Sequence, residues 1–119
     1  MARQSKPLVL ITGSNGNIGK ALGKSLSSDY HVLGLDRDAP ADLVADLTSD
    51  ESMAEAFNQL RRKHGKKIAA VIHLAAYFDF SGDKSPLYDE VNVRGSERLL
   101  NALRDFDVER FVYSGTMLV

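Results

Sequence analysis

The sequence contains no cysteine, no long apolar run and no block of like charge. Without cysteine the chain forms neither a disulfide framework nor a thiolate metal site, and its redox compartment stays undetermined. The apolar stretch near the amino terminus is too short for a signal peptide, and no later stretch approaches the length of a membrane span. We therefore expect a cytoplasmic protein with no membrane partner.

Charged residues make up 26% of the chain, and the formal net charge is -1. The most basic segment, RRKHGKK at residues 61–67, lies where a helix is expected to end, and cations there complement the helix dipole. A nucleic-acid footprint needs a wider basic face, so we expect no nucleic-acid partner. The 119 residues are enough for one domain with a core, which we place at residues 1–119.

Four short apolar runs rich in branched residues predict strands that are buried on both faces of a sheet. The runs are Leu8–Thr12, His31–Asp36, Ile68–Ala76 and Arg110–Gly115. Segments with helical periodicity separate them. This β-α-β-α-β-α-β alternation predicts an α/β fold, a doubly wound parallel sheet of the Rossmann type with helices on both faces.

The second and third helices carry recognisable end signals. Thr48 and Glu51 fit a capping box at the start of the second helix, and Gly65 suits its end. The third helix is expected to begin at Ser85, with Pro86 at its first position.

A glycine turn, ITGSNGNIGKAL at residues 11–22, joins the first strand to the first helix. Gly13 permits a tight turn, Gly16 lets the backbone approach a pyrophosphate, and Gly19 allows close packing of the helix on the strand. Phosphates would then face free N–H groups at a helix N-terminus. Glycines also mark ordinary turns, but here the pattern follows a strand and opens a helix, which favours dinucleotide binding.

The second strand ends at Asp36, 20 residues after Gly16. A carboxylate there can accept hydrogen bonds from the adenosine ribose and would repel a 2′-phosphate, which favours NAD as the cofactor. Arg37 argues for NADP instead, because an arginine at this point can accommodate its 2′-phosphate. A third interpretation is that Asp36 and Asp38 are turn residues before Pro40.

Taken together, these segments resemble the amino-terminal part of the extended short-chain dehydrogenase/reductase family, the NAD-dependent epimerases and dehydratases that act mostly on nucleotide sugars. The resemblance covers essentially the whole chain. It is carried, in the family's order, by TGSNGNIG (12–19), ADLTS (45–49), HLAA (73–76), VNVRGSERLL (91–100) and FVYSGTMLV (111–119).

The resemblance implies a set of cofactor-binding residues. They are Gly13, Asn15, Gly16, Asn17, Ile18, Gly19, Asp36, Arg37, Asp46, Leu47, Leu74, Ala75, Ala76 and Asn92. In the family the pyrophosphate lies against the positions of Asn17 and Ile18, and an acidic-apolar pair, here Asp46 and Leu47, borders the adenine ring. Other interpretations remain for two positions: Asp46 in an exposed acidic loop, and Asn92 as a solvent-facing helix residue. We expect His73 to be a packed residue rather than an acid or base.

The last segment resembles the family's strand and loop with the catalytic hydroxyl, which falls on Thr116, with Ser114 as the alternative. In the family, a tyrosine further on exchanges the proton, and a lysine four residues later lowers the tyrosine pKa. That pair is absent from the 119 residues. Tyr30, Tyr77, Tyr88 and Tyr113 are followed four positions later by Gly34, Ser81, Asn92 and Met117.

These observations lead us to expect the cofactor-binding half of a longer NAD-dependent enzyme that acts on a small-molecule substrate, with the 119 residues alone inactive. In the 3-2-1-4-5-6 strand order of this fold the strand at residues 110–115 would be interior, and an open edge would need cover. Two alternatives remain: a non-catalytic dinucleotide-binding module that pairs with itself or a partner through this edge, and an NADP-dependent aldehyde or ketone reductase.

Overall fold

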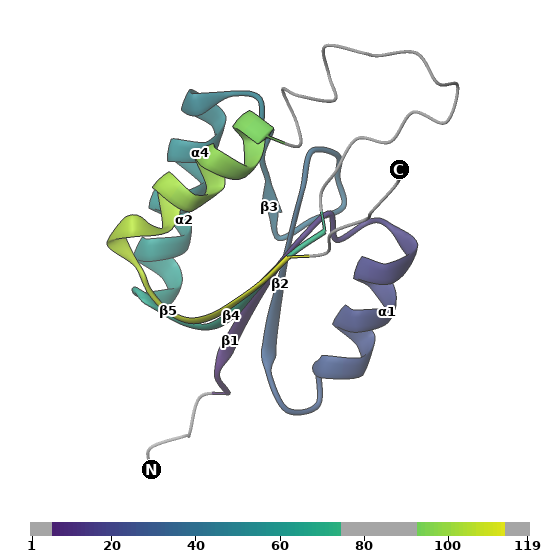
Figure 1. Ribbon diagram of the computed structural model, residues 1–119. Helices are drawn as coiled ribbons and strands as arrows, with labels where there is room; N and C mark the ends of the chain where they lie inside the picture. The colour runs from purple at the N-terminus through teal and green to yellow at the C-terminus, as the bar shows by residue number, and fades with distance from the viewer. Residues whose placement is uncertain (1–5, 75–92, 114–119) are drawn as a thin grey trace, which may run out of the picture.

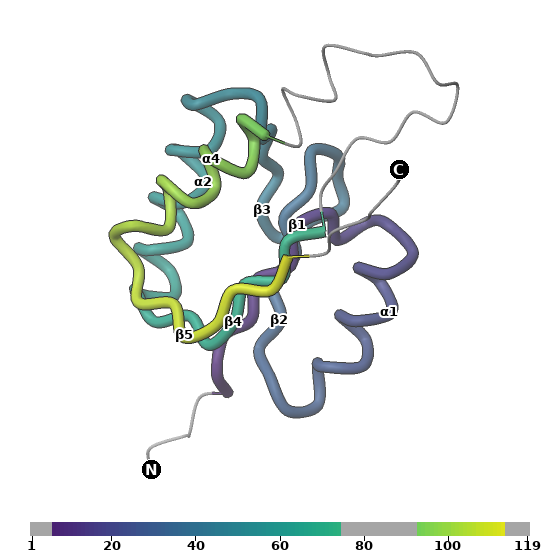
Figure 2. Tube along the Cα trace, in the orientation of Figure 1, coloured from purple at the N-terminus to yellow at the C-terminus, as the bar shows by residue number. Residues whose placement is uncertain are grey.

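The computed structural model describes residues 6–74 and 93–113. In chain order the elements are β1 (Leu8–Thr12), α1 (Asn17–Leu26), β2 (His31–Asp36), β3 (Leu43–Val44), α2 (Asp50–His64), β4 (Lys67–His73), α4 (Gly95–Ala102), the 3-10 helix η2 (Leu103–Asp105) and β5 (Asp107–Tyr113). The strands form one parallel sheet in the order β3-β2-β1-β4-β5. Helix α1 covers one face, and α2 and α4 cover the other (Figures 1 and 2). The predicted Rossmann-type α/β fold is confirmed.

The central strand β1 is buried along its whole length, and Leu10 and Ile11 are fully inaccessible. It pairs with β2 on one side and β4 on the other, so Thr12 lies opposite His73. Because all three strands run in the same direction, their carboxyl ends meet at one edge of the sheet. Thr12, Asp36 and His73 therefore end their strands on the same side of the molecule.

The sequence interpretation missed β3, which has only two residues, too few for a periodic pattern. The strand at residues 67–73 is therefore the fourth and lies beside β1, and the strand at residues 107–113 is the fifth. This strand begins three residues before the predicted start. Within the described part of the chain, β5 is an edge strand.

The predicted capping box of α2 is wrong by one residue. The N-cap is Ser49, whose Oγ accepts a hydrogen bond from the Ser52 N–H at 3.1 Å. Thr48 instead donates its hydroxyl to Asp46 Oδ1 at 2.6 Å, so it belongs to the preceding loop. The other end of α2 agrees with the prediction: Gly65 is the C-cap, with φ 84°.

The larger part of the core lies between the sheet and the layer of α2 and α4. Helix α2 contributes Met53, Phe57 and Leu60, all of which are buried. The ring of Phe57 meets that of Phe106 edge to face at 5.8 Å, which joins α2 to the turn before β5. None of the helices in residues 6–74 and 93–113 has the length and apolar character needed to cross a bilayer.

Replacing Ser49 by alanine should lower the free energy of unfolding by about 1 kcal/mol, because the N–H of Ser52 loses its acceptor. Urea unfolding followed by circular dichroism measures this difference. Glu51→Ala is the control and should change stability by less than about 0.5 kcal/mol. A larger loss of stability in Glu51→Ala than in Ser49→Ala would instead support the predicted capping box of Thr48 and Glu51.

Candidate functional site

The turn between β1 and α1 is fixed to the end of β2. Gly13 adopts a left-handed conformation, with φ 71°, which a residue with a side chain rarely adopts. Its N–H donates to the carbonyl oxygen of Leu35 at 2.8 Å, and the N–H of Gly16 donates back to the Gly13 carbonyl at 3.1 Å. The turn is therefore closed on itself and attached to the neighbouring strand.

Helix α1 packs directly on this turn at Gly19. A Cβ at this position would lie 2.5 Å from the carbonyl oxygen of Gly13 and 2.9 Å from the Cα of Ser14. Both contacts are with backbone, so a larger residue would displace the turn or the helix. This is the close packing that the sequence predicted for the third glycine.

The first turn of α1 is open to solvent. Gly16 is the N-cap, no side chain caps the helix among the described residues, and the first turn holds no acidic residue. Asn17 and Ile18 are exposed, with Ile18 62% accessible. The first N–H groups of a helix have no partner within it, and the helix dipole adds positive potential there. The turn thus suits an anionic group such as a pyrophosphate.

The carboxylate of Asp36 is bound to the glycine turn. Its Oδ2 accepts a hydrogen bond from the Asn15 N–H at 2.9 Å, and Oδ1 accepts one from the Asp38 N–H at 3.2 Å. The side chain of Asn15 donates to the carbonyl oxygen of Asp38 at 2.7 Å. Asp36 is thus the last residue of β2, and its carboxylate accepts N–H groups both from the glycine turn and from the turn that follows the strand. Arg37 is exposed and lies 3.8 Å from Asp38, a separation at which an exposed ion pair contributes little.

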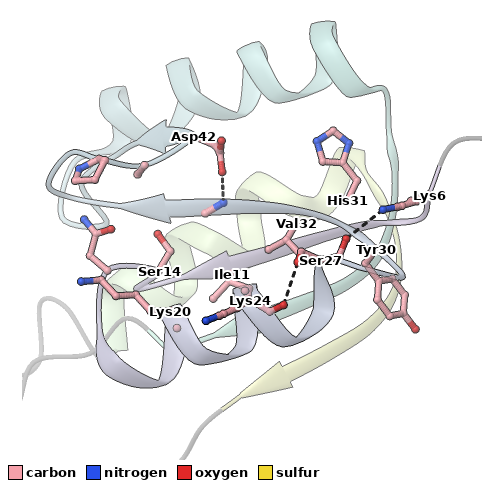
Figure 3. A pocket seen from close by; sticks show the side chains of 16 residues that line it. Lys6, Ile11, Ser14, Lys20, Lys24, Ser27, Tyr30, His31, Val32 and Asp42 are labelled. Carbon is pink, nitrogen blue, oxygen red and sulfur yellow. Dashed lines mark hydrogen bonds between the residues drawn. The ribbon is translucent and has the colours of Figure 1, made fainter.

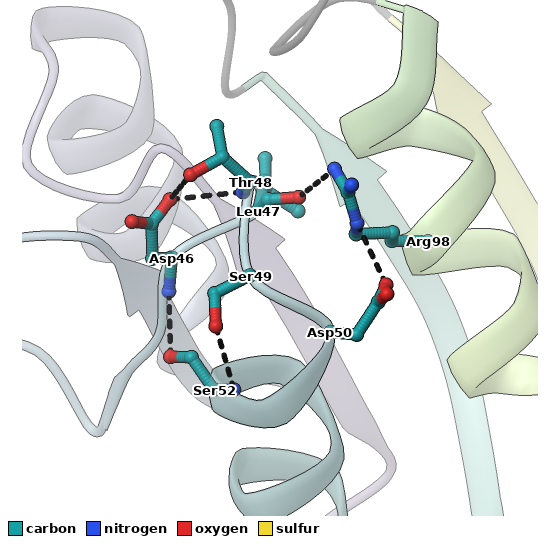
Figure 4. A network of polar contacts seen from close by, with 7 residues as sticks. All are labelled: Asp46, Leu47, Thr48, Ser49, Asp50, Ser52 and Arg98. Atoms are coloured by element: carbon teal, nitrogen blue, oxygen red, sulfur yellow. Dashed lines mark hydrogen bonds and ion pairs between the residues drawn. The ribbon is translucent and has the colours of Figure 1, made fainter.

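The loop at residues 45–49 holds Asp46 in one orientation (Figure 4). Oδ1 of Asp46 accepts hydrogen bonds from the hydroxyl of Thr48 at 2.6 Å and from its N–H at 2.9 Å. These bonds lower the pKa of Asp46, because both stabilise the ionised form. Asp46 is half-buried and Leu47 is only 6% exposed. The alternative of a simple exposed acidic loop therefore does not describe this segment.

A buried polar network crosses the sheet edge at His73. His73 is 1% exposed, its Nδ1 lies 2.6 Å from Thr12 Oγ1, and its Nε2 lies 2.9 Å from Ser96 Oγ. Thr12 Oγ1 also accepts the N–H of Leu74 at 3.0 Å. Burial lowers the pKa of His73 to about 4, so the ring is neutral near neutral pH. His73 is packed, as expected, and it connects β1, β4 and α4. Residues 12, 73 and 96 are far apart in sequence, so local spacing gives no sign of this network.

A groove of about 730 Å³ runs between α1 and β2 (Figure 3). Ser14 and Asn15 line one end, near the glycine turn, while Lys6 and His31 line the other, at the amino end of the sheet. In open α/β sheets ligands bind outside the carboxyl ends of the strands. The groove therefore overlaps the expected cofactor site only at its glycine-turn end.

The structure brings together the glycine turn, Asp36 and the loop with Asp46 and Leu47 along the carboxyl edge of the sheet. Leu74 is also at this edge, where its N–H contacts Thr12. Five of the predicted site residues lie outside the described residues: Ala75, Ala76, Asn92, Ser114 and Thr116.

A parallel sheet with a glycine turn, an open helix N-terminus and a carboxylate at the end of β2 is typical of the Rossmann-type dinucleotide-binding fold. The sequence profile of the NAD dependent epimerase/dehydratase family matches residues 9–119, which is most of the chain. The chain belongs to this family.

Known relatives agree with this assignment. Short-chain dehydrogenase/reductase family 42E member 1 from Bos taurus is 32% identical over 98% of this chain and 31% of its own length. L-arabinose 1-dehydrogenase (NAD(P)(+)) from Haloferax volcanii is 28% identical over 91% of this chain and 40% of its own. The structure of 3-alpha-hydroxysteroid dehydrogenase from Pseudomonas sp. B-0831 complexed with NADH matches with a TM-score of 0.78 and 27% identity, covering 92% of this chain and 48% of that one. The chain spans about a third to a half of the length of these proteins.

Replacing Gly19 by alanine should lower the free energy of unfolding by about 1–3 kcal/mol, since the new methyl group meets backbone atoms of the turn. Gly23→Ala is the matched control in the same helix. Its Cβ would meet only Val32 Cγ1 at 3.9 Å, so this variant should gain up to about 1 kcal/mol from helix propensity. Thermal and urea unfolding of both variants measure the contrast, and a stable Gly19→Ala protein would contradict the packing described.

The buried His73 should make stability fall as the pH decreases from 6.5 to 4. The unfolded chain takes up a proton near the ordinary pKa of 6.5, whereas the folded chain does so only near 4. The free energy of unfolding should therefore lose roughly 3 kcal/mol across this window, a loss that His73→Gln removes. Urea unfolding at intervals of pH measures it as the difference between wild type and His73→Gln, since His64, whose pKa burial also lowers, contributes to both proteins. Identical pH profiles for wild type and His73→Gln would exclude this coupling.

Proposed function

We propose that this chain binds NAD(H) and forms the cofactor-binding half of an oxidoreductase of the epimerase, dehydratase or dehydrogenase type. The observation that carries the proposal is the amino end of α1, which no side chain of the described residues caps, beside the carboxylate of Asp36. The amino end of the helix suits a pyrophosphate, and the carboxylate suits a ribose with free hydroxyls. The hydrogen bond from the Asn15 N–H to Asp36 joins the two features. The family membership and the relative solved with NADH support the choice of cofactor.

Each part of the cofactor has residues that fit it. The N–H groups of Asn17 and Ile18 would hold the pyrophosphate, and Asp36 would accept hydrogen bonds from the adenosine ribose hydroxyls. The apolar side of Leu47 and the carboxylate of Asp46 would border the adenine. The side chain of Asn15 already binds Asp38, so we assign it to shaping the turn rather than to direct contact.

The bound nicotinamide would supply a hydride acceptor or donor for a carbon of the substrate. In this proposal the hydroxyl of Thr116, or of Ser114 in its place, holds the reacting oxygen of the substrate. Relatives whose names specify a sugar and a hydroxysteroid support an alcohol or carbonyl substrate, and the family resemblance favours a sugar nucleotide. The 119 residues contain no Tyr-x-x-x-Lys pair, so we propose that they bind the cofactor without completing the reaction.

A second candidate function is a binding module that pairs through β5. On this edge strand Phe111 is 40%, Val112 48% and Tyr113 55% exposed, which is unusual for large apolar side chains in a parallel sheet. Val112→Lys in the protein at its natural length would separate the two functions. Loss of self-association or of partner binding with unchanged NADH affinity would favour the module.

The wild-type protein should bind NADH about tenfold more tightly than NADPH, since Asp36 repels a 2′-phosphate. Asp36→Asn should reduce or reverse this preference, because the charge is lost while one acceptor for the turn remains. Titrations that follow the fluorescence of the reduced nicotinamide give both affinities. Asp38→Asn is the control, since the Asp38 carboxylate makes no contact with the glycine turn among the described residues. A wild type that prefers NADPH would support an aldehyde or ketone reductase that uses Arg37.

A further inference from the structure

The side chain of Arg98 connects helix α4 to the loop at residues 45–49 and to the first residue of α2 (Figure 4). Its Nε donates to Asp50 Oδ1 at 2.7 Å, and its Nη1 donates to the carbonyl oxygen of Leu47 at 3.1 Å. The Arg98 side chain is only 20% exposed, whereas that of Asp50 is 87% exposed. The guanidinium is thus largely withdrawn from water, and its planar fork fixes the direction of both bonds.

The carbonyl that Arg98 holds belongs to the same peptide group as the N–H of Thr48. That N–H donates to Asp46 Oδ1 at 2.9 Å. One planar peptide is therefore fixed at both ends, by Arg98 at its oxygen and by Asp46 at its nitrogen. Rotation of this peptide would break both hydrogen bonds together, so Arg98 limits the orientation of the Asp46 carboxylate without contacting it.

Asp46 presents one carboxylate oxygen away from the loop. Thr48 uses Oδ1 twice, and the Asp46 N–H donates to Ser52 Oγ at 2.9 Å, which fixes the backbone of the same residue. Oδ2 accepts a hydrogen bond from no residue in the described ranges, and Figure 4 shows it directed away from Thr48. A free, oriented carboxylate oxygen suits an amino group as hydrogen-bond donor.

We propose that Arg98 is a positioning residue for adenine recognition. It holds the peptide between Leu47 and Thr48 so that Asp46 Oδ2 accepts a hydrogen bond from the exocyclic amino group of the adenine. This inference rests on the proposed function, since it assumes that the dinucleotide is the ligand. It adds a residue from α4, 51 positions away in sequence from the carbonyl that it binds.

The test compares NADH with reduced nicotinamide hypoxanthine dinucleotide, which lacks the exocyclic amino group. Wild type, at its natural length, should bind NADH about tenfold more tightly, as expected for one hydrogen bond of about 1.4 kcal/mol. Arg98→Met keeps the aliphatic stem and removes the guanidinium, and with it the bonds to Asp50 and to the Leu47 carbonyl, so its preference should fall to about twofold or less. Arg104→Met is the matched control, because Arg104 is an exposed residue of η2, directly after α4.

A milder variant covers the case in which Arg98→Met does not fold. Asp50→Ala removes an exposed acceptor but leaves the bond from Arg98 to the Leu47 carbonyl, so the preference for NADH should fall only partly, to about threefold. An affinity loss of equal size for both dinucleotides in these variants would indicate a general structural role and would overturn the inference.

The other outcomes distinguish the two proposals. If wild type binds neither dinucleotide, the proposed function fails and the role of Arg98 fails with it. If wild type binds both dinucleotides but does not discriminate, or if Arg98→Met discriminates as wild type does, NAD binding stands and the inference about Arg98 is wrong.

Discussion

The contact between α1 and the glycine turn is the constraint on which the site depends. At Gly19 the helix comes so close to the carbonyl of Gly13 that no side-chain atom fits between them. This contact aims the axis of α1 at the carboxyl edge of the sheet and leaves its first N–H groups exposed. The same turn is hydrogen-bonded to Leu35 and Asp36, so the N-terminus of the helix and the carboxylate at the end of β2 are held beside each other.

The layers of the fold and the glycine turn could be predicted from the sequence, since both depend on local patterns. Buried parallel strands are continuous apolar runs, and three glycines at a spacing of three mark the turn. Strand β3 could not be found in this way, because a strand of two residues is too short to show a hydrophobic pattern. The two strands predicted after it are therefore the fourth and fifth of the sheet. The predicted N-cap of α2 is wrong by one position, because Thr48 and Ser49 are both good capping residues. The hydrogen bond from the Thr48 hydroxyl to Asp46 decides between them.

The contacts that join distant segments were beyond sequence reasoning for a different reason. Arg98 meets the loop before α2, and His73 meets Thr12 and Ser96, only because the sheet places β4 beside β1 and α4 beside α2. In the sequence Arg98 resembles any charged residue on a helix surface. Its interaction with a backbone carbonyl has no sequence pattern, because every residue carries such a group.

The hydrogen bond between Thr12 and His73 also affects which register of β1 and β4 the chain adopts. The residues of β1 from Leu8 to Ile11 are all apolar, so sliding β4 along β1 by one position would still bury apolar side chains on both faces. It would, however, place Thr12 opposite a different residue, so the buried hydrogen bond between the hydroxyl and the imidazole, worth about 1 kcal/mol, would be lost. The buried polar pair therefore favours the observed register of β1 and β4 over shifted registers. Burial of the apolar residues alone does not provide this specificity.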